Sequence, residues 1–590
     1  MKLTSIELTN FKAIGEKVVI PVRPITLLFG ANSAGKSSIL QCLSMLAQSM
    51  RVGKMLEPHL FGKGPLVDVG SYRDFIHAHD TSKAFECKFN FDMDADDFFS
   101  SIFLCDDDCP KNFHLNNSAN KFKAILSEFN RVSISFRFGD ASMHDICFYL
   151  GDNVIPVFLY SSKVVPNGNH MYWKMYWGAF REEVYAKLYA YPKSVMDGKS
   201  LIADDVKKYQ ESNGKEGIKI FSDKELSRFR KHLAEYSPES LLALYGLLSW
   251  HDTPEYQQLK GGILSGKSEF ETVFNFYEAD NIEQSNYLTE FSGFLPTKFA
   301  NLAAQDLFFN DQSHWSGDSR EHYDGDTFHP AQLLLPVAIY VEHNLALLSH
   351  LGPLRREPER IYLRDGTSSK SKDNDGGNYV YRLANDNDLV GQVNCELEQL
   401  QVGYQIKIVH LTDQEAGTDY GVFLLQFIDQ KTGVAASIKD VGFGFSQILP
   451  VIVQCCTARY ATVLIEQPEL HLHPAMQAEL GDMFIRGAFG TVTKKGPGHV
   501  PSSWELKQNH FFIETHSEHL ILRLLRRIRE TTDGELPENV PPITPDDIAV
   551  LYVQPGDRGA QVIHIPVTAE GEFATPWPGG FFAERAKELF

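Results

Sequence analysis

The sequence ITLLFGANSAGKSSIL, Ile25 to Leu40, contains the clearest motif of the chain. Its first five residues are β-branched or apolar, which predicts a buried strand. Gly30 to Ser37 fit the pattern GxxxxGK[ST], and apolar residues at helical spacing follow at once. A P-loop requires a strand before this pattern and a helix after it. We therefore expect a phosphate-binding loop in an α/β fold.

The residues of this loop suit a nucleoside triphosphate. Its glycines let backbone amides wrap around a phosphate, and the helix N-terminus adds a partial positive charge. Lys36 would reach the β- and γ-phosphates, and Ser37 would bind Mg²⁺ through its hydroxyl. The alternative is a Gly/Ser turn that opens an ordinary helix. The residues predicted to bind the nucleotide here are Gly30, Asn32, Ser33, Ala34, Gly35, Lys36, Ser37 and Ser38.

Composition restricts the class of protein. With 590 residues, 43% hydrophobic and 22% charged, the chain is predicted to be globular and to hold more than one structural unit. Its net charge of −20 argues against nucleic-acid binding through the overall field, although a local basic patch could bind nucleic acid. Eight cysteines without paired spacing predict a reducing, cytoplasmic setting. Cys105 and Cys109 fit a solvated acidic turn better than a metal site.

No signal peptide or membrane span is predicted, so no membrane partner is expected. Polar residues such as Lys2, Glu7 and Lys12 interrupt the N-terminal segment. The longest apolar run, LLLPVAIYVEHNLALL from Leu333, contains proline, glutamate and histidine within fewer residues than a span needs. It predicts a buried helix.

The acid that would complete the phosphate site comes late in the sequence. The apolar strand Thr462 to Glu466 ends in a carboxylate. In a compact GTPase or kinase the metal-binding acid comes soon after the P-loop. The two halves of the site must therefore come together across an insertion.

Several segments resemble ABC-type ATPases of the structural-maintenance-of-chromosomes, RecF and OLD group. More narrowly, the chain looks like prokaryotic AAA-15-type ATPases with a DUF3696-like C-terminus, and the likeness covers about residues 1–75 and 345–590. The segments that carry these resemblances are VGFGFSQ, TVLIEQPE and THS for the group, and EQPELHLHP, LGPLR and WPGGFF for the narrower family. The resemblance implies ATP and Mg²⁺ as cofactors and an ATP-driven homodimer or higher oligomer formed through the ATPase heads.

The resemblance also implies a fold and its divisions. We expect an α/β fold, a P-loop ABC-type ATPase head with a mixed sheet, together with a large inserted α/β or α+β region. No sustained heptad occurs, so no long coiled coil is predicted. The predicted divisions are an N-terminal ATPase lobe at 1–85, an insertion at 86–345, a C-terminal ATPase lobe at 346–530 and a DUF3696-like segment at 531–590.

The same resemblance implies catalytic roles. Glu466 takes the Walker B position and would orient Mg²⁺ through water, and His516 takes that of the histidine that senses the γ-phosphate. Gln467 stands where these ATPases carry the glutamate that polarises water. An amide can orient water but cannot accept its proton, so slow hydrolysis is expected. Glu469 or Glu514 could supply the base if either lies within hydrogen-bond reach, and the sequence does not choose between them.

The segment VGFGFSQ takes the place of the signature loop, which in this group reaches the γ-phosphate of a partner head. Gly444, Ser446 and Gln447 are the predicted contact residues, and Ser446 would also cap the following helix. Because LSGGQ is not spelled out, a plain helix cap is the alternative. His471 and His473 alternate like metal ligands, but they lie at the dimer-interface D-loop position and no third ligand is evident.

Two arginine clusters contrast with the acidic average. In LILRLLRRIRE the apolar residues share one helical face and leave the arginines on the other. These arginines could form a solvated face or bind nucleic acid, and the first cluster could instead reach nucleotide phosphate. The clusters are Arg355, Arg356 and Arg360, and Arg523, Arg526, Arg527 and Arg529.

The leading hypothesis is an ATP-dependent switch that senses a trigger and controls a separate effector in antiphage defence. The acidic cluster of an OLD-type nuclease should follow the ATPase, but the segment after Glu530 is short. This favours a separate effector such as the HNH-type nuclease of Septu-like systems. The alternative is a RecF- or SMC-like ATPase that binds DNA in repair or genome maintenance. A scaffold with a degenerate nucleotide site is a third possibility.

Overall fold

The computed structural model describes most of the predicted ATPase head and part of the predicted insertion. The described residues are 2–52, 54–55, 59–93, 130–150, 158–164, 171–177, 285–292, 295–301, 331–355, 359–363, 379–412, 419–490 and 507–578. Cys105, Cys109, Arg356 and residues 579–582 of the WPGGFF segment lie outside them. Two compact units are distinguished: unit 1 comprises Met1–Leu3, Gly53–His59 and Glu86–Val341, and unit 2 comprises Thr4–Val52, Leu60–Phe85 and Glu342–Phe590.

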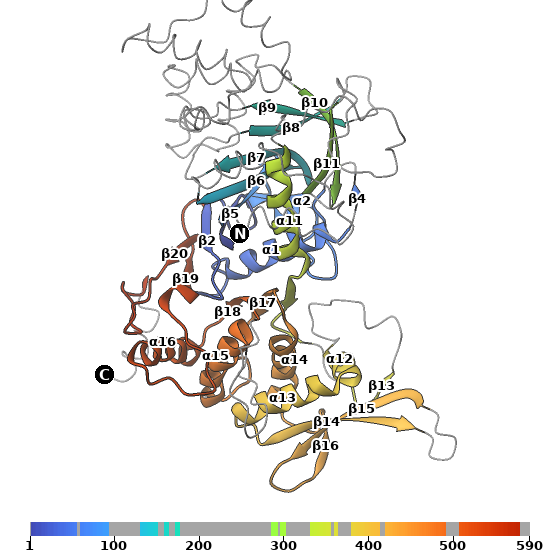
Figure 1. Cartoon of the computed structure of the whole chain (residues 1–590), viewed down its shortest axis with the longest axis vertical. Helices are drawn as coiled ribbons and strands as arrows, with labels where there is room; N and C mark the ends of the chain where they lie inside the picture. The colour runs from blue at the N-terminus through green and yellow to red at the C-terminus, as the bar shows by residue number, and fades with distance from the viewer. Residues whose placement is uncertain are drawn as a thin grey trace, which may run out of the picture. The chain divides into compact units, whose positions relative to one another are not determined.

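Unit 1 is built on a sheet with the strand order β11-β10-β9-β8-β7-β6-β5, and β4 pairs with β10 (Figure 1). The pairs from β6 to β11, and the pair β4 with β10, are antiparallel. The strands are β4 (Lys54–Met55), β5 (Phe85–Asp92), β6 (Arg131–Gly139), β7 (Ser142–Leu150), β8 (Phe158–Val164), β9 (Met171–Trp177), β10 (Ser285–Ser292) and β11 (Leu295–Asn301). Cys87, Phe89 and Phe91 are buried at every second position of β5, as expected for a strand with one face in a core.

Helix α11 (Ala331–Ala346) confirms the buried helix predicted from the apolar run. Val337 and Val341 on it are fully buried. No helix among the described residues has the length and apolar character needed to cross a membrane. The longest helices in the described ranges have 16 residues, and none forms a long coiled coil.

The sheet that carries the P-loop lies in unit 2 and has the order β12-β17-β18-β3-β19-β20. Its first five strands are parallel and β20 is antiparallel to β19, so the predicted mixed sheet is confirmed. All residues of β3 and β17 are buried, because parallel strands are covered on both faces. The strands are β3 (Ile25–Gly30), β12 (Ser349–Leu351), β17 (Thr462–Glu466), β18 (His510–Glu514), β19 (Ile548–Gln554) and β20 (Gln561–His564).

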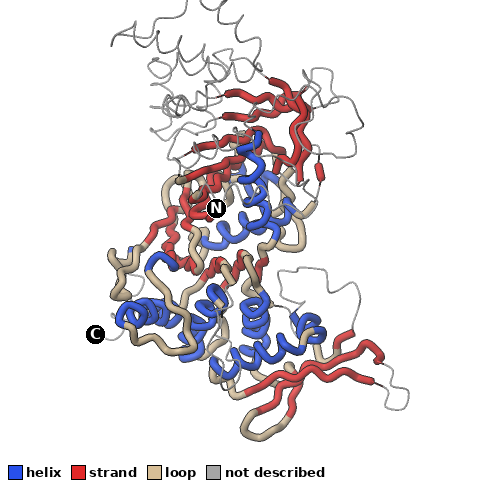
Figure 2. Tube along the Cα trace, viewed as in Figure 1, coloured by secondary structure: helices blue, strands red, loops and turns tan. Residues whose placement is uncertain are grey.

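Helices flank this sheet, and each central strand leads toward one (Figure 2). Strand β3 leads into α1, β17 into α15 and β18 into α16. Because the carboxyl ends of parallel strands share one edge of a sheet, the three connecting loops meet at that edge. The main helices of unit 2 are α1 (Lys36–Met50), α12 (Tyr379–Asn385), α13 (Asn387–Gln399), α14 (Phe443–Thr457), α15 (Pro474–Phe489) and α16 (Glu518–Asp533).

Smaller elements complete unit 2. Strands β1 and β2 form an antiparallel hairpin, and β13, β15, β14 and β16 form a second antiparallel sheet. Their bounds are β1 (Lys2–Thr9), β2 (Val18–Pro21), β13 (Tyr362–Leu363), β14 (Tyr404–Thr412), β15 (Asp419–Asp429) and β16 (Ala435–Ser437). The short helical turns are α2 (Tyr72–Phe75), η1 (His77–His79) and η5 (Pro545–Asp547).

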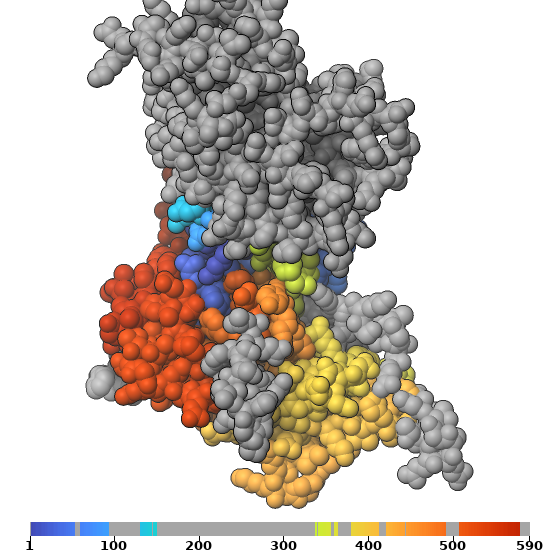
Figure 3. Space-filling view, viewed as in Figure 1, coloured from blue at the N-terminus to red at the C-terminus, as the bar shows by residue number. Residues whose placement is uncertain are grey.

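Helix α16 lies in the surface segment coloured red in Figure 3, but most of its arginines are paired. Arg527 is 2.7 Å from Asp482, and Arg523 is 2.6 Å from Asp482 and 2.7 Å from Glu479. Arg527 is buried, so it does not belong to the solvated face that the sequence pattern allowed. A buried carboxylate on the adjacent α15 requires a partner, and the arginines supply it.

Candidate nucleotide-binding site

Two glycines of the P-loop occupy positions that other residues would strain. Gly30 has a φ of +142°, and a Cβ there would lie 2.1 Å from the carbonyl oxygen of Val553. Gly35 has a φ of +107° at the N-cap of α1, and a Cβ there would lie 2.9 Å from that of Ala13. Both positions therefore require glycine, and the loop turns tightly between β3 and α1.

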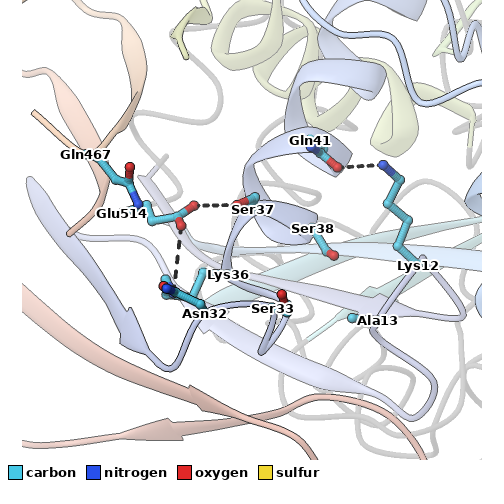
Figure 4. A pocket seen from close by; sticks show the side chains of 11 residues that line it. Lys12, Ala13, Asn32, Ser33, Lys36, Ser37, Ser38, Gln41, Gln467 and Glu514 are labelled. Carbon is cyan, nitrogen blue, oxygen red and sulfur yellow. Dashed lines mark hydrogen bonds and ion pairs between the residues drawn. The ribbon is translucent and has the colours of Figure 1, made fainter. Parts of the chain in front are cut away.

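A cavity of about 400 Å³ lies over this loop (Figure 4). All of its lining residues belong to unit 2. They are Lys12, Ala13, Asn32, Ser33, Gly35, Lys36, Ser37, Ser38, Gln41, Gln467 and Glu514. Of the predicted P-loop residues only Gly30 and Ala34 do not line it, and Ala34 is buried beneath. The volume is in the range of small-molecule and cofactor sites.

Lys12 and Gln41 line the cavity without having been singled out in the sequence. The Lys12 ammonium donates to Gln41 Oε1 at 2.6 Å. Lys12 follows strand β1, which is not part of the P-loop motif, and no sequence pattern around it indicates a contact with a nucleotide. Only the fold shows that it adds a second cation to the cavity wall.

Lys36 is buried, and its ammonium is surrounded by oxygen atoms. It donates to the carbonyl oxygens of Gly30 and Ala31 at 3.0 and 2.9 Å, and it lies 3.8 Å from Glu514 Oε1. Burial lowers the pKa of Lys36, while the charges of Glu514 and Glu469 oppose this effect. An ammonium with three donors in such a place can bind phosphate oxygens at the strength of a charge-assisted hydrogen bond.

The predicted metal ligands Ser37 and Glu466 have different partners. The hydroxyl of Ser37 donates to Glu514 Oε2 at 2.7 Å. Glu466 ends β17, one strand further along the sheet, and its Oε1 lies 2.9 Å from His350 Nε2. The other ring nitrogen of His350 lies 3.0 Å from the hydroxyl of Ser44. Ser44, His350 and Glu466 therefore form a buried polar chain.

Gln467 lies at the edge of the cavity in a strained backbone conformation. Its φ is +46°, which is uncommon for a residue other than glycine. Its N–H donates to the carbonyl oxygen of Glu514 at 2.7 Å, which ties the end of β17 to the end of β18. The side chain of Gln467 lines the cavity, as a residue that orients water must.

Glu469 and His516 carry buried polar atoms that make no hydrogen bond with the described residues. Glu469 Oε1 accepts from the N–H of His516 at 2.7 Å, whereas Glu469 Oε2 and His516 Nε2 have no partner among them. Burial raises the pKa of Glu469. Burial, and then the charge of Lys36, lowers the pKa of His516. Neither residue is among those that line the cavity, but both interact electrostatically with Lys36. Orphaned atoms so close to a P-loop fit the oxygens of a phosphate and a water molecule.

Arg355 binds the backbone at the end of β17 and in the loop that follows it. Its guanidinium donates to the carbonyl oxygens of Glu466 at 2.8 Å and Gln467 at 3.5 Å. Its own N–H donates to Gln447 Oε1 at 3.3 Å. Burial lowers the pKa of Arg355 to about 10. The arginine thus holds backbone carbonyls, and it is not among the residues that line the cavity.

The signature-like segment lies away from the cavity of its own chain. Helix α14 begins at Phe443 with Gly442 as N-cap, so the prediction that Ser446 caps this helix is wrong. Ser446 lies inside the first turn, and both it and Gln447 are buried. A Cβ on Gly444 would lie 2.7 Å from the carbonyl oxygen of His471, so glycine is needed for this close approach.

The two histidines after β17 do not form a metal site with other described residues. His471 and His473 are exposed, and His473 Nδ1 accepts from the N–H of Ala475 at 3.3 Å at the start of α15. No group of three potential ligands occurs in the described part of the chain. Ser517 caps α16, since its hydroxyl accepts from the N–H of Leu520 at 3.1 Å.

Comparison with known families gives two matches, both to ATPase-type domains and each over less than half of the chain. Residues 1–257 match the family described as "AAA ATPase domain". Residues 277–523 match the family described as "AAA domain, putative AbiEii toxin, Type IV TA system". No curated protein matches the sequence.

Among solved structures the chain is similar to heads of SMC proteins. The SMC head domain from Thermotoga maritima has 7% identity and a TM-score of 0.31, over 96% of this chain and 100% of that one. The Smc head domain with an extended coiled coil, bound to the C-terminal domain of ScpA and derived from Pyrococcus furiosus, has 11% identity and a TM-score of 0.32, over 100% of this chain and 98% of that one. Because the TM-scores and identities are low, no argument rests on these two structures.

ATP and Mg²⁺ are the cofactors of this ATPase type, and the residues present fit them. The glycine-lined loop, the buried ammonium of Lys36 and the hydroxyl of Ser37 provide phosphate and metal contacts. The carboxylates of Glu466 and Glu514 lie at the ends of adjacent strands. Two carboxylates and a hydroxyl are enough for Mg²⁺, which keeps several waters and shares the phosphates.

Proposed function

We propose that this chain is an ATP-binding, slowly hydrolysing dimeric switch that senses a trigger and controls a separate effector in antiphage defence. The observation that carries the switch is the side chain of Gln467 in the wall of a complete phosphate cradle. Such a site has what it needs to hold ATP, but an amide stands where the resembled ATPases carry the glutamate that polarises the attacking water. A long-lived ATP state is what a switch requires.

Slow hydrolysis has a chemical route through Glu469. Gln467 would orient the water, and Glu469 Oε2 would accept its proton. The water oxygen would bond to the γ-phosphorus while the bond from this phosphorus to the bridging oxygen breaks, so that ADP and phosphate leave. Glu469 suits this role because its Oε1 is fixed by His516, its Oε2 has no partner among the described residues, and burial raises its pKa. Phosphoryl transfer depends mainly on positioning and charge, so a remote base gives slow rather than absent turnover.

Dimerisation through the heads is supported by the N-terminal end of α14. Gly442 is exposed and nothing lies close to where its Cβ would be, so a partner's phosphate could approach the first amides of this helix. The buried side chains of Ser446 and Gln447 would then act by shaping the turn. Backbone amides, rather than the hydroxyl, would make the contact across the dimer.

A separate effector and a role in defence have two supports. The match to a family described as a putative AbiEii toxin of a toxin–antitoxin system points to a defence setting. The described residues hold no cluster of acids and histidines that could bind the metal of a nuclease. An HNH-type nuclease on another chain would fill this role. The ion-paired arginines of α16 weaken the alternative of a DNA-binding repair protein.

The proposal is tested by turnover and by assembly in one set of samples. Phosphate release from the wild type should be slow, faster in Gln467→Glu, and lost in Glu469→Gln. ATP, but not ADP, should convert monomer to dimer in light-scattering chromatography, and Gly442→Trp should block this step without changing ATP binding. Brisk hydrolysis that Gln467→Ala abolishes and Glu469→Gln leaves intact would contradict the slow switch. Steeply salt-dependent DNA binding that needs ATP would favour the repair function.

A further inference from the structure

The geometry points to Glu514, rather than the Walker B residue Glu466, as the carboxylate that orients Mg²⁺ beside Ser37. The inference rests on the proposed function because it concerns the same ATP site. It assigns separate tasks to three acids that the pairing of β17 with β18 brings to one edge of the sheet. Glu514 orients the waters of the metal, Glu469 accepts the proton, and Glu466 is bound to His350.

Glu514 is the acid nearest to the serine of the P-loop. It ends β18, which pairs directly with the P-loop strand β3, and Glu514 lies opposite Leu28 in the register. Its Oε2 accepts from the Ser37 hydroxyl at 2.7 Å, and its Oε1 lies 3.8 Å from the Lys36 ammonium. Figure 4 shows this carboxylate between the two side chains at the wall of the cavity.

This placement suits a ligand that acts through water. Mg²⁺ in phosphate sites keeps several of its waters, and a carboxylate beside the serine ligand can accept hydrogen bonds from them. The Lys36 ammonium lies 3.8 Å from the other oxygen of the same carboxylate, so the two charges balance each other. An acid at hydrogen-bond distance from Ser37 meets this requirement directly.

Glu466 has a different environment. It lies one strand further from β3 and is not among the residues that line the cavity. Its Oε1 is bound to the buried His350 at 2.9 Å, and His350 is bound to Ser44. Its carbonyl oxygen is held by Arg355. One oxygen of its side chain and its backbone carbonyl oxygen therefore already have partners other than Ser37.

Glu514 is also less suited than Glu469 to act as the base. Each of its oxygens already lies beside a cationic or hydroxyl donor, Lys36 or Ser37. Glu469, in contrast, keeps one buried oxygen without a partner among the described residues. A proton acceptor needs a free lone pair, whereas a residue that orients a metal's waters needs a fixed position next to the metal ligand.

The test measures how much Mg²⁺ strengthens ATP binding. The affinity for a fluorescent, non-hydrolysable ATP analogue is determined by titration in EDTA and in excess Mg²⁺, for the wild type, Glu514→Gln and Glu466→Gln. Glu514→Gln should reduce the gain from Mg²⁺ by about tenfold or more, with binding in EDTA retained or tightened because a negative charge beside the phosphates is gone. Glu466→Gln should change the gain by less than about threefold.

The outcomes separate this inference from the proposed function. Loss of the Mg²⁺ gain in Glu466→Gln but not in Glu514→Gln, or an equal loss in both, would overturn the inference alone. Failure of the wild type to bind the analogue in either buffer would overturn the proposed function. Thermal melting checks the fold of each variant. If Glu514→Gln does not fold, Glu514→Asp carries the test, since the shorter acid should also lose the gain.

Discussion

The pairing of α15 with α16 and the nucleotide cradle both bury charged side chains in unit 2, but they satisfy them differently. Between the helices, Asp482 accepts from both Arg523 and Arg527, and Arg527 also reaches Glu530. In the cradle, Glu469 and His516 each keep a buried atom without a partner among the described residues. In a structural network the charged groups bind one another, whereas in a binding site some polar atoms stay unbonded until the ligand arrives.

The pKa of a buried carboxyl group also shifts in opposite directions in the two regions. Burial raises the pKa of both Asp482 and Glu469, but at Asp482 the hydrogen bonds and charges of Arg527 and Arg523 outweigh burial and lower it. The arginine partners of Asp482 therefore favour its charged form, whereas burial disfavours the charged form of Glu469 and makes its carboxylate a stronger base. Charge in the first region supports the fold, and charge in the second is available for chemistry.

The largest expected effect is on the helix pair. Asp482→Ala should destabilise the protein by about 3 kcal/mol, because it leaves the buried Arg527 with one acidic partner fewer. Since the pKa of Asp482 is lowered, its contribution is present above the ordinary pKa of an aspartate and is lost as the pH falls through the lowered value. Denaturant unfolding at neutral and acid pH measures both features. Glu479→Ala, which leaves Asp482 in place, is the matched control, and an equal loss in it would refute the pairing argument.

In the cradle the largest effect should appear in binding. Lys36→Met should weaken ATP binding by about 100-fold, since a buried ammonium in contact with phosphate is lost. Its melting temperature should change far less than that of Asp482→Ala, because the ammonium here serves a ligand more than the fold. Calorimetric titration with ATP and Mg²⁺ measures the first effect. Unchanged affinity, or a collapse of the fold, would remove the distinction between the two regions.

The sequence predicted the parts of the site that follow one another along the chain. The strand, the P-loop glycines and the following helix lie in one continuous segment, so local patterns identify them, and the mixed α/β sheet is confirmed. Glu466 was placed at a strand end because the apolar run Thr462 to Glu466 has strand character. These predictions rest on backbone geometry that neighbouring residues determine.

The partners of these residues could not be predicted from local patterns. The bond between His350 and Glu466 depends on the pairing of β12 with β17, and that between Ser37 and Glu514 depends on the pairing of β18 with β3. The prediction for Ser446 was wrong because it relied on a local pattern alone. A serine near a helix start is typical of a cap, but α14 begins three residues earlier. Arg527 was expected on the polar face of its helix, either solvated or bound to nucleic acid, because the sequence gives no sign of Asp482 on the neighbouring helix.

A smaller effect is expected when the buried charge of Glu469 is removed. The pKa of Glu469 is raised, so the wild type is relatively stable below the ordinary pKa of a glutamate and loses this stability as the pH rises through the raised value. Glu469→Gln is neutral at every pH and should be more stable than the wild type at neutral pH, by on the order of 1 kcal/mol. Melting temperatures measured from acid to neutral pH should differ between the wild type and Glu469→Gln at neutral pH and become equal in acid. A variant that is less stable at neutral pH would contradict the raised pKa.

The smallest effect should come from an arginine at the edge of the helix network. Arg526 binds Glu530 at 2.6 Å, but its side chain is 56% exposed, and Glu530 keeps its bond to Arg527. Exposed ion pairs on helices contribute a few tenths of a kcal/mol, so Arg526→Ala should change the stability by less than about 0.5 kcal/mol. Added salt should reduce even this difference, whereas it should leave the effect of Asp482→Ala nearly unchanged because that site is buried. A loss of stability in Arg526→Ala comparable with that in Asp482→Ala would contradict this argument. It would mean that the exposed ion pairs of α16 stabilise the protein as much as the buried ones do.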